Sequence, residues 1–171
     1  MDEDDIIEHA VTAAVEGLGG AWEVLACDPA FADTAAFCAH YGIAAEGSAN
    51  TIVVATKRDP RRYAACVVLA TTRLDVNGIV KRRLDGGKCS FLGADETAGL
   101  TGRQIGGVTP VGLPADLPVW IDSAVLDRPS VVVGGSSRRM KLRLAPEALL
   151  RLPAAEVVEG LAVAARPSST S

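Results

Sequence analysis

The sequence has no long apolar run, which argues against a membrane-spanning protein. A transmembrane helix needs about 20 apolar residues in succession, and no stretch of this chain approaches that length. Residues 1–5 are mostly acidic, whereas a secretory signal begins with basic residues followed by an apolar stretch. We therefore expect a cytoplasmic protein with no membrane partner.

The sequence also lacks the motifs of several common catalytic sites. It contains neither the glycine-rich P-loop of nucleotide-binding proteins nor the nucleophile elbow of many serine hydrolases. Zinc sites need three or four ligands, but the chain has only two histidines, and its four cysteines form no CxxC pair. Cys38 and His40 alone do not complete such a set, although composition leaves a Cys–His nucleophilic pair open. We expect no metal, no cofactor and reduced cysteines.

The length and composition that remain are those of one globular domain. The 171 residues are 49% hydrophobic, which is enough for a core without disulfides or metals. We expect a single domain over residues 1–165 and a polar tail over 166–171. The spacing of apolar residues predicts helices over 6–18, 34–41, 75–84 and 154–164, and a further helix beginning at Pro146. Strands are expected over 22–27, 51–56, 63–70, 88–92, 119–123, 130–133 and 140–144.

Charge is unevenly distributed along the chain. The net charge of −4 argues against a nucleic-acid-binding protein, but clustered cations can still attract a polyanion. The alternative is that each cluster is simply a solvated face. Three clusters stand out, at residues 57–62, 81–83 and 138–143.

Residues 106–113 carry the strongest sign of a binding site. This glycine- and proline-rich stretch, GGVTPVGL, allows close approach of a ligand and directs backbone N–H groups into a pocket. Such donors can hold a carbonyl oxygen or an oxyanion. A plain structural turn explains the same composition equally well.

Several further motifs occur together with this loop, in a consistent order. They lie at residues 74–75, 92–96, 100–102, 117–122, 132–135 and 142–146. With the loop, they resemble the YbaK/EbsC/prolyl-tRNA editing domain family from about Phe31 to Pro153. The resemblance implies an α+β fold, in which a curved, mixed and mainly antiparallel sheet is flanked by helices.

The resemblance also implies a function. Members of the family hydrolyse the ester between a wrong amino acid and its tRNA, in trans or as part of a synthetase. Such a step is needed because a binding pocket rejects a missing methylene by only about 1–3 kcal/mol. The expected partners are aminoacyl-tRNA and an aminoacyl-tRNA synthetase, and the expected state is a monomer or weak dimer.

One residue departs from the family pattern. Asn50 stands where the family carries a lysine, so a charge is lost while hydrogen bonding is kept. Asn50 could also simply cap the turn before its strand. Two alternatives to an editing hydrolase therefore remain: a non-catalytic module that binds aminoacyl-tRNA or an amino-acid-like ligand, and a partner that only docks a synthetase.

The resemblance and the loop together give a set of candidate site residues. The candidate catalytic residues are Asn50, Gly106 and Gly107. The candidate substrate-binding residues are Val108, Thr109, Pro110, Gly112, Gly134 and Gly135. The candidate tRNA-binding residues are Arg58, Arg61, Arg62, Lys81, Arg138 and Arg139.

Overall fold

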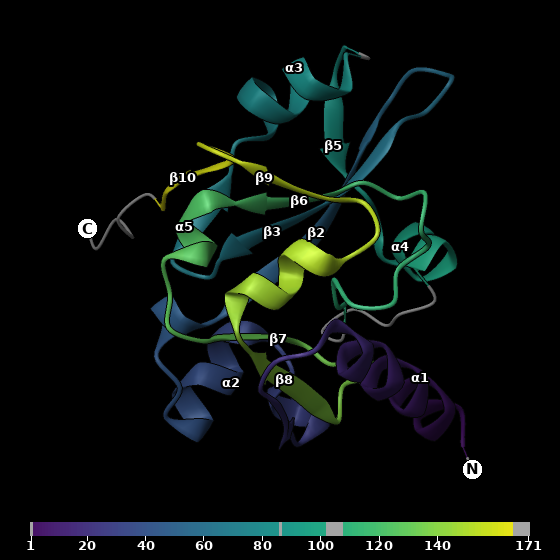
Figure 1. Cartoon of the computed structure of the whole chain (residues 1–171). Helices are drawn as coiled ribbons and strands as arrows, with labels where there is room; N and C mark the ends of the chain where they lie inside the picture. Colours follow the sequence, from purple (N-terminus) through teal and green to yellow (C-terminus); the bar gives the residue numbers. More distant parts are fainter. Residues whose placement is uncertain (1, 86, 102–107, 166–171) are drawn as a thin grey trace.

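The computed structural model of the chain describes residues 2–85, 87–101 and 108–165 (Figure 1). The tail expected over 166–171 lies outside these residues. The helical elements are α1 (Glu3–Leu18), η1 (Pro29–Phe31), α2 (Thr34–Tyr41), η2 (Ala45–Gly47), η3 (Val76–Val80), α3 (Lys81–Leu84), α4 (Ala94–Thr101), α5 (Ser123–Leu126) and η4 (Pro146–Arg151).

A five-stranded mixed sheet forms the centre of the molecule. Its order is β5-β2-β3-β6-β9, made from β5 (Cys89–Phe91), β2 (Ala49–Thr56), β3 (Tyr63–Leu69), β6 (Val119–Asp122) and β9 (Ala155–Val158). The pairs on the β5 side are antiparallel, whereas β6 pairs in parallel with both β3 and β9. Helices flank this sheet, so the predicted α+β class, with one mixed sheet flanked by helices, is confirmed.

A second sheet lies against the beginning of β2. It is antiparallel, in the order β1-β8-β7, and consists of β1 (Trp22–Ala26), β8 (Met140–Leu144) and β7 (Val131–Gly134). A parallel bridge between Ser48 and Val132 joins it to the chain just before β2. The two sheets therefore meet at the beginning of β2, next to Asn50.

The strands β2 and β3 read as continuous apolar runs because both of their faces are buried. Val53 packs into the core that contains α1 and η4, while its neighbour Val54 packs into a second core on the opposite face. Val67 and Val68 divide between the two cores in the same way. Alternation sends successive side chains to opposite faces, so the part of a strand that is covered on both sides, such as residues 53–55 of β2, is apolar.

The helix α1 begins three residues earlier than its apolar spacing predicts. Asp2 and Asp5 form a reciprocal capping box, in which each side chain accepts a hydrogen bond from the backbone N–H of the other. This cap satisfies N–H groups that the first turn leaves without partners. The buried residues Val11 and Val15 then attach the helix to the core.

The prediction of a helix over residues 154–164 is wrong. Residues Ala155–Val158 form β9 and Ala162–Ala164 form β10, which pairs with β4 (Thr72–Leu74). Gly160, at φ +74°, turns the chain between them. The alanine and glutamate residues favour a helix, but the open edge of β6 offers backbone partners that outweigh this weak preference.

Two other helical segments differ in type from the expectation. The segment expected as a helix over 75–84 begins as the π-helical turn η3 and continues as α3. The segment that begins at Pro146 is a 3₁₀-helix. Lys81, a candidate tRNA-binding residue, is the first residue of α3.

Candidate active site

A cavity of about 240 Å³ opens where the two sheets meet. It lies beside the beginning of β2, the first turn of α2 and the end of β7. Its lining residues are Asp33, Thr34, residues 49–52, Val108, Gly134 and Lys141. Asn50, Val108 and Gly134 are predicted site residues from three segments that are far apart in the sequence. All three line this one cavity.

Asn50 is the second residue of β2, and its side chain is held by α2. The Thr34 hydroxyl donates a hydrogen bond of 2.5 Å to Asn50 Oδ1. A carboxamide has one acceptor oxygen and an NH₂ group with two donors. Because Oδ1 accepts from Thr34, the NH₂ group is the part of Asn50 that can donate to a ligand.

The cavity follows an edge of β2 that β5 does not cover. Within the described residues, β5 pairs only with residues 54–56 of β2, so the edge over residues 49–52 faces the cavity. Thr51 lies on this stretch, and its Oγ1 is buried without a hydrogen-bond partner among the described residues. An unpaired buried hydroxyl is unfavourable, so Thr51 adds a polar atom that a ligand or water can satisfy.

The glycine–proline loop reaches this cavity through Val108, which is half-buried in its wall. Gly106 and Gly107 lie outside the described residues. Thr109 is fully buried, and its Oγ1 accepts a 3.2 Å hydrogen bond from Val111 N–H, so this side chain supports the loop from within. Pro110 is buried and Gly112, at φ +77°, forms an exposed turn; neither is among the lining residues.

The two candidate glycines at the end of β7 have different surroundings. Gly134 lines the cavity and is the register partner of Lys141 in β8. Gly135 does not line it. A Cβ at position 135 would lie 2.6 Å from the carbonyl oxygen of Met140, so Gly135 is needed for the close approach of β7 and β8.

Lys141 is a cavity residue that the sequence did not single out. Only 5% of it is exposed, and its Nζ donates a 2.5 Å hydrogen bond to the carbonyl oxygen of Ala32. The ammonium also lies 5.7 Å from the centre of the Phe37 ring. Burial lowers the pKa of Lys141, and the nearby Asp33 partly offsets this effect. Sequence reasoning placed Lys141 in a surface cluster because its burial depends on α2 covering β8.

The sequence of residues 28–152 matches the family model of the aminoacyl-tRNA editing domain. The chain belongs to this family. The predicted family is confirmed, and membership supports a general role in the editing of aminoacyl-tRNA. The matched segment includes Asn50, Val108, Gly134 and Lys141.

Solved structures show the same fold. One, described as a candidate trans-editing enzyme for prolyl-tRNA synthetase, is 28% identical to this editing domain, with a TM-score of 0.74; the match covers 90% of this chain and 95% of that one. The hypothetical protein APE2540 is 26% identical, with a TM-score of 0.78 and coverage of 90% and 99%. A scaffold used for computational epitope grafting is 27% identical, with a TM-score of 0.74 and coverage of 90% and 96%.

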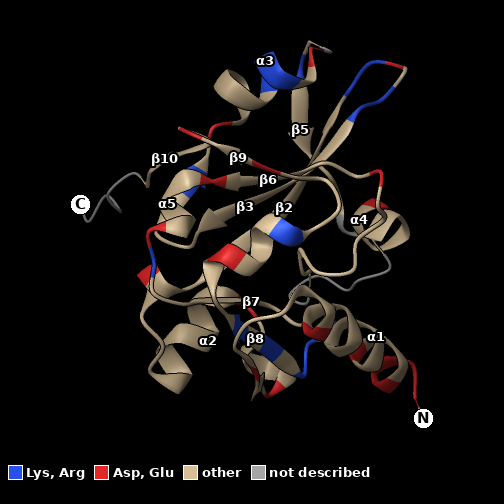
Figure 2. Cartoon of the chain, in the orientation of Figure 1, with Lys and Arg blue, Asp and Glu red and all other residues tan. Residues whose placement is uncertain are grey.

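The cations predicted to bind tRNA fall into two groups in the editing domain. The first lies on the loop between β2 and β3 and on α3, at the upper edge of Figure 2. It contains Arg58, Arg61, Arg62 and Lys81. Within it, Arg61 forms an ion pair of 2.6 Å with Glu96, and Arg62 donates to the carbonyl oxygen of Leu84.

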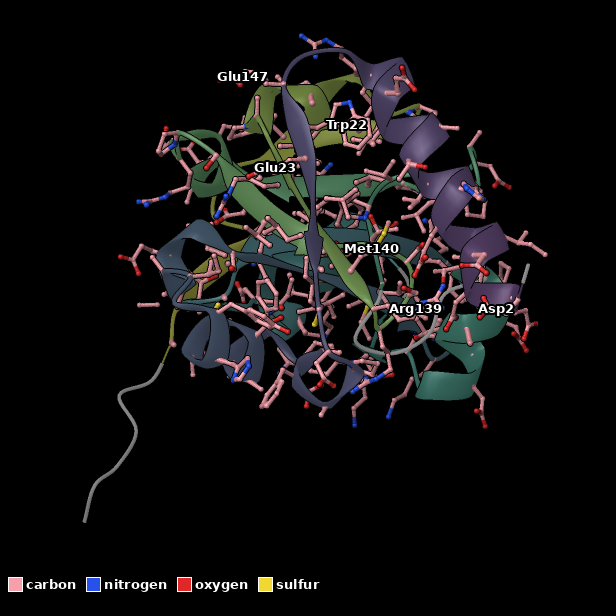
Figure 3. The ribbon with its side chains drawn as sticks, turned by 90° about the horizontal axis from the view of Figure 1, so that it is seen from below. Asp2, Trp22, Glu23, Arg139, Met140 and Glu147 are labelled. Carbon is pink, nitrogen blue, oxygen red and sulfur yellow. The ribbon has the colours of Figure 1, made fainter. Side chains whose placement is uncertain are left out.

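The second group precedes β8 and faces the amino-terminal part of the chain. Arg138 donates a hydrogen bond to the carbonyl oxygen of Pro29. Arg139 lies beside Asp2 (Figure 3) and is also within 4 Å of carboxylate oxygens of Asp4, Asp5 and Glu8. These four carboxylates weaken the positive potential that a phosphate would meet at Arg139.

Across residues 2–85, 87–101 and 108–165, no three His, Cys, Asp or Glu side chains converge as a metal-binding group. None of the helices in the same residues is long and apolar enough to span a membrane.

Proposed function

We propose that this editing domain is an aminoacyl-tRNA deacylase that acts in trans, in the cytoplasm, on mischarged tRNA. The observation that carries the proposal is the single cavity lined by Asn50, Val108 and Gly134. The likeness to a candidate trans-editing enzyme for prolyl-tRNA synthetase supports it. A cavity of about 240 Å³ is smaller than the roughly 300–1,000 Å³ of drug-sized ligand sites, so it suits an aminoacyl group and the edge of a ribose.

The reaction is hydrolysis of the ester that joins the amino acid to the terminal ribose. A water oxygen attacks the carbonyl carbon, and the electron pair of the C=O bond moves onto the carbonyl oxygen. The tetrahedral species then collapses: the C=O bond re-forms, the bond to the ribose oxygen breaks, and that oxygen takes the proton that the attacking water gives up. The products are the free amino acid and a tRNA with a free terminal hydroxyl.

Each candidate catalytic or substrate-binding residue has a role in this proposal. The Asn50 NH₂ group donates to the ester carbonyl or to a ribose hydroxyl, while the N–H groups of Gly106 and Gly107 serve as oxyanion donors. Val108 and Gly134 form the pocket wall. Thr109, Pro110, Gly112 and Gly135 hold the two turns that shape it. Asp33, exposed at the rim, binds the α-ammonium group of the aminoacyl moiety.

The cations on the β2–β3 loop and α3 extend the site along the tRNA. Six residue-to-residue steps of extended strand lead from Asn50 to Thr56, which corresponds to about 20 Å. With the ester in the cavity, phosphates upstream of the terminal nucleotide reach Arg58, Arg62 and Lys81. These contacts give affinity without sequence preference.

The test is deacylation of a panel of mischarged tRNAs by the purified protein. We expect at least one aminoacyl-tRNA to be hydrolysed faster than its spontaneous rate. Asn50→Ala should lower that rate at least 10-fold, whereas Asn77→Ala, an exposed asparagine in η3, should leave it unchanged. Failure to deacylate any substrate at high protein concentration would refute the proposal.

A binding-only module is the second candidate, because Asn50 replaces the lysine that the resemblance leads us to expect. This alternative predicts saturable binding of aminoacyl-tRNA without turnover, and a gain of activity in Asn50→Lys. A hydrolase that uses Asn50 itself predicts activity in the unmodified protein and no such gain.

A further inference from the structure

Lys141 places a buried cation in the wall of the proposed active site. On β8, Met140, Leu142 and Leu144 pack into the main core, so Lys141 projects from the opposite face, where α2 covers the strand. Its Nζ donates to the carbonyl oxygen of Ala32 at 2.5 Å. The lysine therefore lies between β8 and the segment that leads into α2.

The strand opposite Lys141 leaves space beside it. Its register partner on β7 is Gly134, which has no side chain to fill the cavity. Both residues line the same cavity as Asn50. Among the described lining residues, Lys141 and Asp33 carry charge, and Lys141 alone carries a positive one.

A buried ammonium group at a strand position is less favourable for folding than an apolar side chain. Desolvating it is strongly unfavourable, and an apolar side chain of similar length would pack at lower cost. The same low dielectric strengthens the attraction of the ammonium for negative charge. The lowered pKa of Lys141, caused mainly by burial, agrees with such an environment.

We propose that Lys141 supplies, from β8, the positive charge that stabilises the ester carbonyl oxygen as it becomes an oxyanion. The proposal rests on the proposed deacylase function and adds a catalytic residue to it. It also accounts for Asn50: the resemblance places a lysine at the start of β2, and here the cation enters the same cavity from β8 of the second sheet. The bond changes are those of the hydrolysis above, and Lys141 keeps its proton throughout.

A structural role for Lys141 is the alternative, in which its bond to Ala32 merely anchors the segment before α2. The variants Lys141→Met and Lys141→Gln separate the two roles. Both remove the charge, but glutamine keeps a donor that can reach towards the Ala32 carbonyl. Arg143→Met is the matched control, because Arg143 lies on the same strand, pairs with Glu23 and does not line this cavity.

The measurement is the single-turnover deacylation rate, with the Kd for aminoacyl-tRNA and the Tm of each variant. We expect Lys141→Gln and Lys141→Met to lose about 100-fold or more in rate, with the Kd changed less than about 5-fold. Arg143→Met should keep the wild-type rate. The double variant Asn50→Lys/Lys141→Met, which returns a cation to the cavity from β2, should recover at least 10-fold over Lys141→Met.

Specific results would overturn the inference. A folded Lys141→Gln protein with a rate within about 3-fold of wild type would show that the charge is not used. A double variant no faster than Lys141→Met would show that the two positions do not share a role. If the wild type deacylates nothing, the proposed function itself fails, and that outcome is distinct from either of these.

Discussion

Thr34 and Asn50 are joined by a 2.5 Å hydrogen bond from the Thr34 hydroxyl to Asn50 Oδ1. The bond connects the first residue of α2 with the second residue of β2. It fixes which end of the carboxamide faces a ligand, because an oxygen engaged by Thr34 leaves the NH₂ group to donate. The helix α2 is therefore part of the site, although the sequence predicts only a short helix there.

Thr34→Val should disturb catalysis more than folding. Valine matches the shape of threonine but removes the hydroxyl, so Asn50 loses the bond that orients it. A hydrogen bond contributes about 0.5–1.5 kcal/mol, and we expect the deacylation rate to fall up to about 10-fold. Thr34→Ser, which keeps the hydroxyl, should stay close to wild type. Equal rates for the valine and serine variants would contradict the assigned orientation of Asn50.

The cations of the β2–β3 loop and α3 should govern the salt dependence of tRNA binding. Each phosphate contact contributes a slope of about −0.7 to −0.9 in log K against log salt concentration. Arg58→Gln with Lys81→Gln should weaken binding and make the slope shallower by about 1 to 2. Arg143→Gln removes the same kind of charge on β8. It should leave the slope unchanged if the tRNA follows the proposed path.

Gly135→Ala should destabilise the protein because two strands approach closely there. The added methyl group would lie 2.6 Å from the Met140 carbonyl oxygen, and backbone would have to move. Overpacking of this kind costs about 1–3 kcal/mol, which lowers the Tm by about 2–4 °C per kcal/mol in a chain of this size. Gly47→Ala, with no atom within 4 Å of the new Cβ, is the control for thermal unfolding.

Glu8 should contribute stability that disappears in acid. A hydrogen bond from Arg139 holds the pKa of Glu8 below its ordinary value, which is about 4.3. A group whose pKa is lowered by folding stabilises the fold above its unfolded pKa, and loses that contribution as the pH falls through its folded pKa. At neutral pH, we expect the free energy of unfolding of the wild type to exceed that of Glu8→Gln by up to about 1 kcal/mol. This difference should shrink below about pH 4.

The control for that measurement is Glu16→Gln, an exposed residue on the same helix. Denaturant unfolding at several pH values gives the free-energy difference for each variant. A difference between wild type and Glu8→Gln that stays constant from pH 7 to pH 3 would show that the ion pair with Arg139 does not stabilise the fold.

Leu161→Ala tests the carboxy-terminal strands, which replace the expected helix. Leu161 is fully buried in the second core, so the change should cost about 2–5 kcal/mol. Val163→Ala, at a position 37% exposed on β10, should cost less than about 0.5 kcal/mol. Similar losses for both variants would contradict the placement of this segment.

The sequence by itself determined the family, the α+β class and the central strands. Residues 52–55 of β2 and 64–69 of β3 are continuously apolar, a local pattern that favours a strand buried on both faces. Asn50, the loop around Val108 and Gly134 were also identifiable as candidate site residues, because their motifs are local in the sequence.

Only the tertiary structure decided the rest, because each remaining feature depends on a partner distant in sequence. Residues 154–164 became strands since β6 and β4 have edges to pair with. Arg139 became part of an ion-pair network because α1 packs beside it. Lys141 entered the cavity because α2 covers its face of β8. Local sequence records neither a neighbouring edge nor a covering helix, and these contacts set both the burial and the charge of the site.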